Sequence, residues 1–226
     1  MKLTNLFLLK RAASEKQRPR LTQIALGVML LLLAVAPSTL RPQSQITVCT
    51  TGGDYQLIQD AVNHASAGDV IAVCPGVFQE NLILRAGVSI QGAGSDVTMV
   101  DGGAAQSVVR ALTADIGNDT TVSQLTLRNG RANSGGGVLV RQGGPTFSNV
   151  VIENNEAWED QGGGIAVLDG AHVTLTNVVV RNNRAGRGGG VSVTGANSQV
   201  YAMNSLLSTN QATVAAGAAL VSVGAA

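Results

Sequence analysis

The stretch NVVVRNNRAGRGGGVSV, residues 177–193, contains the pattern that decides the fold of this chain. A polar amide precedes a short apolar stretch, and a second polar corner, a small residue and three glycines lead into another apolar stretch. Alternating β-branched residues indicate short strands with one buried face. The density of Gly, Asn, Thr and Val excludes helices. The stretch therefore predicts strands separated by tight corners.

Three other segments superimpose on this one, and they begin at Gln124, Asn149 and Asn204. The four starting positions follow one another at intervals of 25, 28 and 27 residues. A unit of this length buries its inner face only against neighbouring units, as in a solenoid. We therefore predict an all-β parallel β-helix of about seven triangular coils over residues 46–226. Inward columns are expected at Leu127, Ile152 and Val180, and at Phe147, Leu175 and Ala202.

The glycine triplets at 135–137, 162–164 and 188–190 are interpreted as tight corners where stacked coils approach closely. A phosphate-binding loop would require a helix directly after the glycines, and usually a lysine, and neither is present. Stacked side-chain amides can hydrogen-bond along the axis of such a fold. The column formed by Gln124, Asn149, Asn177 and Asn204 is therefore predicted to be a structural ladder, with a row of glycan-binding residues as the alternative.

Charged residues form two further columns when the repeats are aligned. Glu153 falls between Arg128 and Arg181, and Glu156 falls between Arg131 and Arg184. Exposed ion pairs of this kind contribute only about 0.2–1 kcal/mol each, but they favour the correct register between coils. The acidic residues nearby also allow a calcium site, although calcium would compete with the four arginines. We predict no cofactor and no metal, with calcium as the alternative.

Trp158, the only tryptophan, is the best candidate for a contact residue, because its ring is too large for the inside of a narrow coil. With Glu159 and Asp160 it forms the predicted binding site, where a sugar would stack on the indole. Residues 39–226 carry nine Arg, no Lys and thirteen Asp plus Glu, so their net charge is 9 − 13 = −4. A mildly acidic domain lacks the charge of a nucleic-acid-binding protein, and that class is excluded.

The N-terminal residues predict export. A basic stretch precedes an apolar run at 24–36, which is shorter than the roughly 20 residues of a membrane-spanning helix. Residues 1–38 are interpreted as a signal peptide, either cleaved or retained as an anchor, and residues 39–45 as a short linker. The protein is then secreted or lies at the cell surface, and it contacts the membrane only through this segment.

Two cysteines support this location. Cys49 and Cys74 each end a strand-like stretch and are 25 residues apart, which is one coil. Neighbouring strands lie about 5 Å apart, so a disulfide can form in an oxidising compartment. Two reduced, buried thiols are the alternative. Between the cysteines, Asp54 is expected to cap a helix over residues 55–65 that covers the open end of the solenoid.

The residues also resemble known families. Residues 52–102 resemble the opening of pectin-lyase-like right-handed β-helix proteins. The repeats IENNEA…GGGI (152–165) and VRNNRA…GGGV (180–191) resemble those of the polymorphic outer-membrane protein family, although an aromatic residue stands in that family where this chain has Ile152 and Val180. The resemblance implies a right-handed helix. It leaves the activity open, because the fold is found in lyases, hydrolases, esterases and adhesins.

The arrangement of acidic residues favours a binding protein over an enzyme. Cleavage of a polysaccharide needs paired carboxylates, or a calcium site with a basic arginine, on one face. No pair of Asp recurs on adjacent strands of the repeats, and Asp101, Asp115 and Asp119 are scattered. We therefore predict an exported, non-catalytic module for structure, adhesion or glycan binding. The alternative is a polysaccharide-processing enzyme, or a remnant of one, with a site within residues 96–120.

The C-terminal repeat is degraded, with Ala216-Gly217-Ala218 where the others have three glycines, and no capping helix follows it. An uncapped coil exposes strand edges and apolar surface. This end is therefore predicted either to be truncated from a longer protein or to meet another subunit by self-association.

Overall fold

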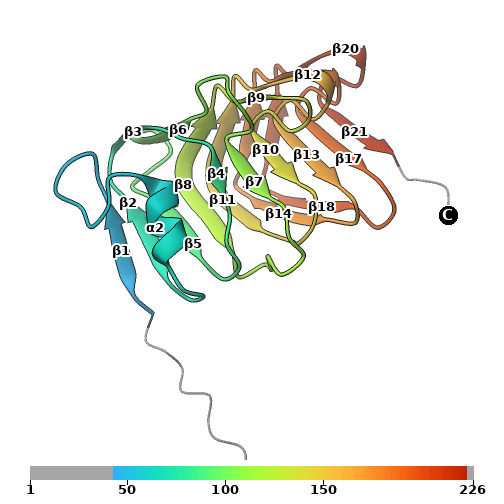
Figure 1. The fold of residues 1–226 in the computed structure, drawn as a ribbon. Coiled ribbons are helices and arrows are strands. Elements are labelled where there is room, and N and C mark those ends of the chain that lie inside the picture. Colours follow the sequence, from blue (N-terminus) through green and yellow to red (C-terminus); the bar gives the residue numbers. More distant parts are fainter. Residues whose placement is uncertain (1–42, 223–226) are drawn as a thin grey trace, which may run out of the picture. The chain divides into compact units, whose positions relative to one another are not determined.

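The computed structural model describes residues 43–222, which form a stack of parallel β-strands with one short helix (Figure 1). The all-β parallel β-helix expected from the repeats is confirmed. The predicted signal at 1–38 and most of the linker lie outside the described residues. In the described part of the chain, no helix has the length and apolar character needed to cross a membrane.

Three parallel sheets make up the turns, and seven successive strands of the largest sheet span about six complete turns. These seven are β1 (Gln45–Val48), β2 (Val70–Val73), β5 (Ser89–Gly92), β8 (Thr121–Arg128), β11 (Thr146–Glu153), β14 (His172–Thr176) and β18 (Gln199–Met203). The same sheet includes β3 (Gly76–Gln79), β6 (Thr98–Asp101), β15 (Val179–Arg181) and β19 (Leu206–Ser208). The second contains β4 (Leu82–Ile83), β7 (Val109–Ala111), β10 (Val138–Val140), β13 (Ile165–Leu168), β17 (Val191–Thr194) and β21 (Ala219–Ser222). The third contains β9 (Arg131–Ala132), β12 (Glu156–Gln161), β16 (Arg184–Arg187) and β20 (Gln211–Ala215).

Left-handed residues make the corners of each turn. In one turn Asn177, Asn182 and Gly188 have φ angles of 54°, 55° and 56°. Among residues with a side chain, Asn adopts this conformation most readily, and Gly adopts it without a steric penalty. The repeated Asn and Gly of the sequence are therefore required by the bends between strands. The equivalent corners of other turns are Gln124, Asn129, Gly135, Asn149, Asn154, Gly162, Asn204, Thr209 and Ala216.

Alternate residues of each strand point inward and stack on their counterparts in the next turn. Ile152 is paired with Leu127 on one side and with Val180 on the other, and all three are fully buried. Phe147 is paired in the same way with Leu175. This register agrees with the inward columns that we expected from the repeats. Ala202, the expected third member of the second column, pairs with Leu175 but is exposed, because it lies in the last turn of the largest sheet. Each turn therefore buries its apolar side chains only against the turns next to it.

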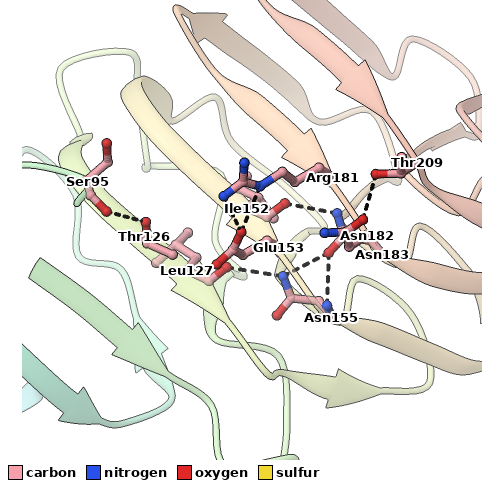
Figure 2. A network of polar contacts seen from close by, with 10 residues as sticks. All are labelled: Ser95, Thr126, Leu127, Ile152, Glu153, Asn155, Arg181, Asn182, Asn183 and Thr209. Atoms are coloured by element: carbon pink, nitrogen blue, oxygen red, sulfur yellow. Dashed lines mark hydrogen bonds and ion pairs between the residues drawn. The ribbon is translucent and has the colours of Figure 1, made fainter. Parts of the chain in front are cut away.

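A ladder of asparagines runs through the interior beside this core (Figure 2). The Oδ1 atom of Asn183 accepts hydrogen bonds from the backbone N–H of Asn155 at 2.9 Å and from its Nδ2 at 3.0 Å. Asn183 in turn donates its own N–H and Nδ2 to Oδ1 of Asn210, at 3.1 Å and 3.0 Å. Its Nδ2 also reaches the carbonyl of Ile152 at 2.9 Å. The ladder thus links three turns and pairs buried polar groups that would otherwise have no partner.

The glycine triplets lie where neighbouring turns are closest. A Cβ atom added to Gly163 would lie 2.4 Å from the carbonyl oxygen of Arg184 in the next turn. One added to Gly164 would lie 2.6 Å from the oxygen of Gly190 and 3.0 Å from Nδ2 of Asn183. Only glycine fits at these two positions, so the triplet allows the asparagine ladder and the adjacent backbone to come together.

The predicted helix is present but shorter and capped differently. Helix α2 spans Ile58–His64, and it contacts β1 and β2 at the N-terminal end of the solenoid (Figure 1). The expected cap by Asp54 is wrong, because that carboxylate accepts hydrogen bonds from the N–H and hydroxyl of Thr47 instead. Both hydrogen bonds lower the pKa of Asp54, and the bond from the Thr47 hydroxyl has the larger effect. Instead, the carboxylate of Glu80 accepts hydrogen bonds from the backbone N–H groups of Ile58 and Gln59 at the start of the helix, at 2.7 Å and 2.8 Å.

A disulfide joins Cys49 and Cys74, whose Cα atoms are 5.0 Å apart, as we predicted from their spacing. Each cysteine follows directly after one of the first two strands, β1 and β2, which are paired in register. The bond therefore closes one complete turn covalently.

The asparagine ladder leads to a prediction about stability. Replacing Asn183 with Ala leaves the buried N–H of Asn155 without its partner and removes the side-chain bond to the carbonyl of Ile152. An unpaired buried polar group costs about 1–3 kcal/mol. We expect the Asn183→Ala variant to lose about 3 kcal/mol of unfolding free energy in urea titrations followed by circular dichroism. The control is Asn182→Gly, which keeps the left-handed corner at an exposed neighbour and should change stability by less than about 1 kcal/mol. Equal losses in the two variants would contradict the role of the buried ladder.

The disulfide leads to a second prediction. A cross-link that closes a loop of 25 residues restricts the unfolded chain by roughly 3.5 kcal/mol. The double variant Cys49→Ala/Cys74→Ala should therefore unfold at a lower urea concentration. Its free energy of unfolding should fall by roughly 3.5 kcal/mol. Incubating the unaltered protein with a reductant should produce the same shift, and the double variant should not respond to it.

Candidate functional site

An open groove of about 370 Å³ lies beside Trp158 on the outside of the solenoid. Its lining comes from three successive turns and includes three arginines, Arg110, Arg131 and Arg141, together with Leu139. No Asp or Glu lines it in the part of the chain that the structure describes. The other lining residues are Ala105, Gln106, Ser107, Ala132, Asn133 and Ser134. The groove therefore combines an aromatic ring with a basic wall.

A β-bulge brings Trp158 to this groove. Four residues separate Ala157 from Gly162, whereas only two separate Ala185 from Gly188 in the next turn. The pairing of β12 with β16 accordingly shifts between Ala157 and Gln161. The extra residues cannot fit into the ladder, so the strand bulges outward and re-aims its side chains. Trp158 is 51% exposed as a result, which leaves much of its ring available for contact.

Arg110 is the central residue of β7 and lines the groove. It lies between the buried Val109 and Ala111 of β7, so its side chain points out of the solenoid, next to Leu139 of β10. Its Nε atom is buried and has no hydrogen-bond partner among the described residues. Because unpaired buried polar groups are rare in folded proteins, Arg110 stands out as the candidate anion-binding residue of the groove. A guanidinium also remains charged at any physiological pH.

The other two arginines already have acidic partners. Arg131 Nε lies 3.2 Å from a carboxylate oxygen of Glu156, and Arg141 lies 3.7 Å from Asp169. Both pairs are more than half exposed on the arginine side, so they are weak and leave the guanidinium groups free to reorient. Arg110 makes no ion pair within the described residues and is therefore the strongest anion-binding group of the groove.

Of the three residues of the predicted binding site, the side chains of Trp158 and Glu159 are described by the structure. Trp158 lines the groove, but Glu159 does not, although it is exposed nearby. The side chain of Asp160 lies outside what the structure describes, so a contact from it stays a prediction. Among the described side chains, no group of three or more His, Cys, Asp or Glu comes together to hold a metal ion.

The charge columns follow the register that the repeats indicate, but their ion pairs differ in part. Glu153 lies between Arg128 and Arg181 in the strand pairing and forms its salt bridge with Arg181 at 2.8 Å. Arg128 pairs instead with Asp101, one turn earlier, at 3.0 Å. Glu156 lies between Arg131 and Arg184 and pairs with Arg131, whereas Arg184 makes no ion pair with a described residue.

Asp101 is held as an anion at the start of the first column. Partial burial raises the pKa of its carboxyl group, but hydrogen bonds from the N–H of Gly103, from the Asn129 amide and from Arg128 outweigh this effect and lower the pKa below its ordinary value. A carboxylate engaged in this way is a poor general acid. The loop residues Asp115 and Asp119 are exposed, and neither they nor Asp101 line the groove beside Trp158.

The amide column lies at the first corner of each turn, and its members are exposed or half-buried. Nδ2 of Asn177 donates to Oδ1 of Asn149 at 3.1 Å, and no such bond joins the described side chains of Gln124 or Asn204 to this pair. The continuous ladder in the interior is formed by Asn155, Asn183 and Asn210 instead. The repeats do not single it out, because the first asparagine of each Asn-Asn pair already accounts for the corner.

The repeats did not indicate Arg110, the central arginine of the groove. Arg110 lies outside the four aligned repeats, and in sequence it is an isolated charge in the stretch Val108–Ala111. The signal that could have identified it is its position between two inward-facing residues, Val109 and Ala111. The two residues inserted before the second glycine triplet were a stronger signal, because an insertion into a regular repeat commonly marks a functional position.

A family model described as "Right handed beta helix region" matches residues 78–222. No curated protein matches the sequence. Among solved structures, similarities are found to pectin methylesterase PemA from Erwinia chrysanthemi, with 15% identity, a TM-score of 0.40 and coverage of 71% of this chain and 64% of that chain. Pectin methylesterase from carrot has 15% identity and a TM-score of 0.38, with 74% of this chain and 65% of that chain covered.

A deglycosylated form of the Aspergillus niger pectin methylesterase has 13% identity and a TM-score of 0.33, with 81% of this chain and 86% of that chain covered. The present chain spans less than two thirds of the first three structures of this kind. Values this low transfer neither a substrate nor a catalytic residue.

The exposure of Trp158 leads to a third prediction. Because half of its ring is already in water, Trp158→Ala should lower the free energy of unfolding by less than about 1 kcal/mol. The fully buried Phe147 provides the comparison, since Phe147→Ala should cost about 3–5 kcal/mol. Thermal unfolding followed by circular dichroism measures both. A loss for Trp158→Ala as large as that for Phe147→Ala would show that the indole belongs to the core.

Proposed function

Because the chain belongs to the family of right-handed β-helix regions, we propose that it is an extracytoplasmic, non-catalytic module that binds acidic glycans in the groove beside Trp158. The observation that carries the proposal is that the exposed Trp158 lines the same groove as Arg110, whose buried Nε has no partner among the described residues. Trp158 would stack on the apolar face of a sugar ring, and Arg110 would bind its carboxylate or sulfate.

The charge of the groove supports an anionic ligand. Its lining has three guanidinium groups and no carboxylate among the described residues. A planar guanidinium binds a carboxylate or sulfate through two parallel hydrogen bonds, which is more specific than a point charge. A neutral sugar would leave the Arg110 Nε–H with only a weak acceptor, so we expect it to bind less tightly.

The absence of carboxylates from the groove lining supports binding without catalysis. Glycoside hydrolysis uses two carboxyl groups on opposite sides of the scissile bond, and the described lining provides neither. Among the described acids, Asp101 is held ionised by its neighbours. A module of this kind would attach its carrier to a surface or matrix rich in acidic polysaccharide.

The disulfide supports an extracytoplasmic location. Bonds of this kind form and persist in oxidising compartments. The predicted signal at residues 1–38 agrees with export, and the adhesive role at a cell surface follows from export together with glycan binding.

The unique tryptophan makes the proposal directly testable. Titration of the protein with oligogalacturonate should change the fluorescence of Trp158, and added salt should weaken the binding because the contact is ionic. Oligomers of neutral galactose should cause a much smaller change. Arg110→Gln should weaken binding of the acidic ligand by about tenfold or more, because a charge-assisted hydrogen bond contributes about 1.5–3 kcal/mol.

The matched control is Arg187→Gln, which removes an exposed arginine outside the groove and should alter affinity by less than about twofold. Equal weakening by the two variants would mean that the contact is non-specific, and the proposed site would be wrong. The same mixtures should be assayed for unsaturated and reducing-end products, with and without calcium. Product formation that Asp101→Asn or Asp119→Asn abolishes would establish an enzyme instead.

A further inference from the structure

A second groove, of about 510 Å³, runs along a different corner of the solenoid. It is lined by the loops that connect the second sheet with the largest one in three successive turns, together with Thr174 of β14 and Tyr201 of β18. The loop residues are Ala114, Ile116, Gly117, Asn118, Gly143, Gly144 and Gly170, and His172 begins β14. Neighbouring turns are about 4.8 Å apart, so the groove follows the solenoid axis with a regular repeat.

The polar side chains of this groove are left without internal partners. Those of Asn118, His172 and Thr174 make no hydrogen bond with other described residues. Outward hydroxyl groups elsewhere behave differently: Thr146 donates to the carbonyl of Asn118, and Thr194 donates to Gln161. The groove therefore offers several free donors and acceptors in a row, which is what a ligand rich in hydroxyl groups requires.

An aromatic ring lies at one end of the row. Tyr201 is 56% exposed, and its hydroxyl group donates to the side chain of Gln199, which restricts the orientation of the ring. Tyr201 lies directly beside Thr174 in the strand pairing. A fixed, half-exposed ring next to free hydroxyl and amide groups is suited to stack on a sugar.

We propose that this second groove binds an extended, uncharged polysaccharide chain, with Tyr201 stacking on one sugar and Asn118, His172 and Thr174 hydrogen-bonding to the others. The ligand is uncharged because no Asp, Glu, Lys or Arg lines the groove in the described part of the chain. It is an extended chain because equivalent positions of consecutive turns face it. An extended peptide fits less well, since peptides add to a free strand edge and this groove crosses the turns at a corner.

The proposal does not depend on acidic glycans binding beside Trp158, and Gly144 allows the second groove to be blocked selectively. A Cβ atom at Gly144 would meet only His172, at ordinary contact distances of 3.4 Å and 3.7 Å, so a larger side chain fits and fills the groove. Gly144→Leu is thus the blocking variant. Ala196→Leu, at an exposed position that does not line the groove, is the matched control.

Affinity electrophoresis of the full chain in gels containing neutral xylan, glucomannan or mixed-linkage glucan tests the proposal. We expect at least one of these polymers to retard the protein, Gly144→Leu to abolish the retardation and Ala196→Leu to leave it unchanged. Tyr201→Ala should weaken it by about tenfold. Circular dichroism melting curves of each variant verify that it is folded.

The retardation should persist in Trp158→Ala, which separates this groove from the basic one. The inference would be overturned if none of the three neutral polymers retarded the protein. It would also be overturned if all three did so and Gly144→Leu did not reduce the retardation. Extended peptides that bind the protein in solution and are blocked by Gly144→Leu would overturn it as well, because they would assign the groove to another class of ligand.

Discussion

The buried hydrogen bonds between Asn155, Asn183 and Asn210 are the constraint on which the rest of the solenoid depends. The side-chain oxygens of Asn183 and Asn210 each accept hydrogen bonds from both the backbone N–H and the side-chain amide of the asparagine one turn earlier. The bonds form only if neighbouring turns are in one register and close together. The glycines opposite the ladder have no side chain for this reason, and the apolar columns follow from the register that the asparagines impose.

This constraint explains which parts of the structure can be derived from the sequence. The repeat fixes the strands, the corners and the inward columns, because each depends on residues a few positions apart. The Cys49–Cys74 bond was predictable for the same reason, since its spacing equals one turn. The capping of α2 was not, because Glu80 reaches the helix from the following turn and nothing local to Asp54 indicates it.

The candidate site beside Trp158 was predictable only in part. Trp158 is an obvious contact residue because a narrow coil cannot contain its ring. Arg110 is 48 residues away in sequence and joins Trp158 only through the stacking of turns. The ion pairs in the charge columns show the same limit. Register determines which residues are neighbours, but Arg128 can turn toward the turn on either side. It pairs with Asp101, whose carboxylate accepts further hydrogen bonds from Gly103 and Asn129. The resemblance to polymorphic outer-membrane proteins stays a prediction.

The disulfide has a mechanical consequence that bears on the proposed adhesive role. A solenoid in which every turn touches only its neighbours can be peeled apart one strand at a time, and each step breaks only a few hydrogen bonds. Tension applied to the N-terminal side would reach β1 first. The covalent link between Cys49 and Cys74 transfers that load past the first turn, so β1 and β2 must give way together. The weakest point of the structure is thereby shifted away from the end that a tether would pull.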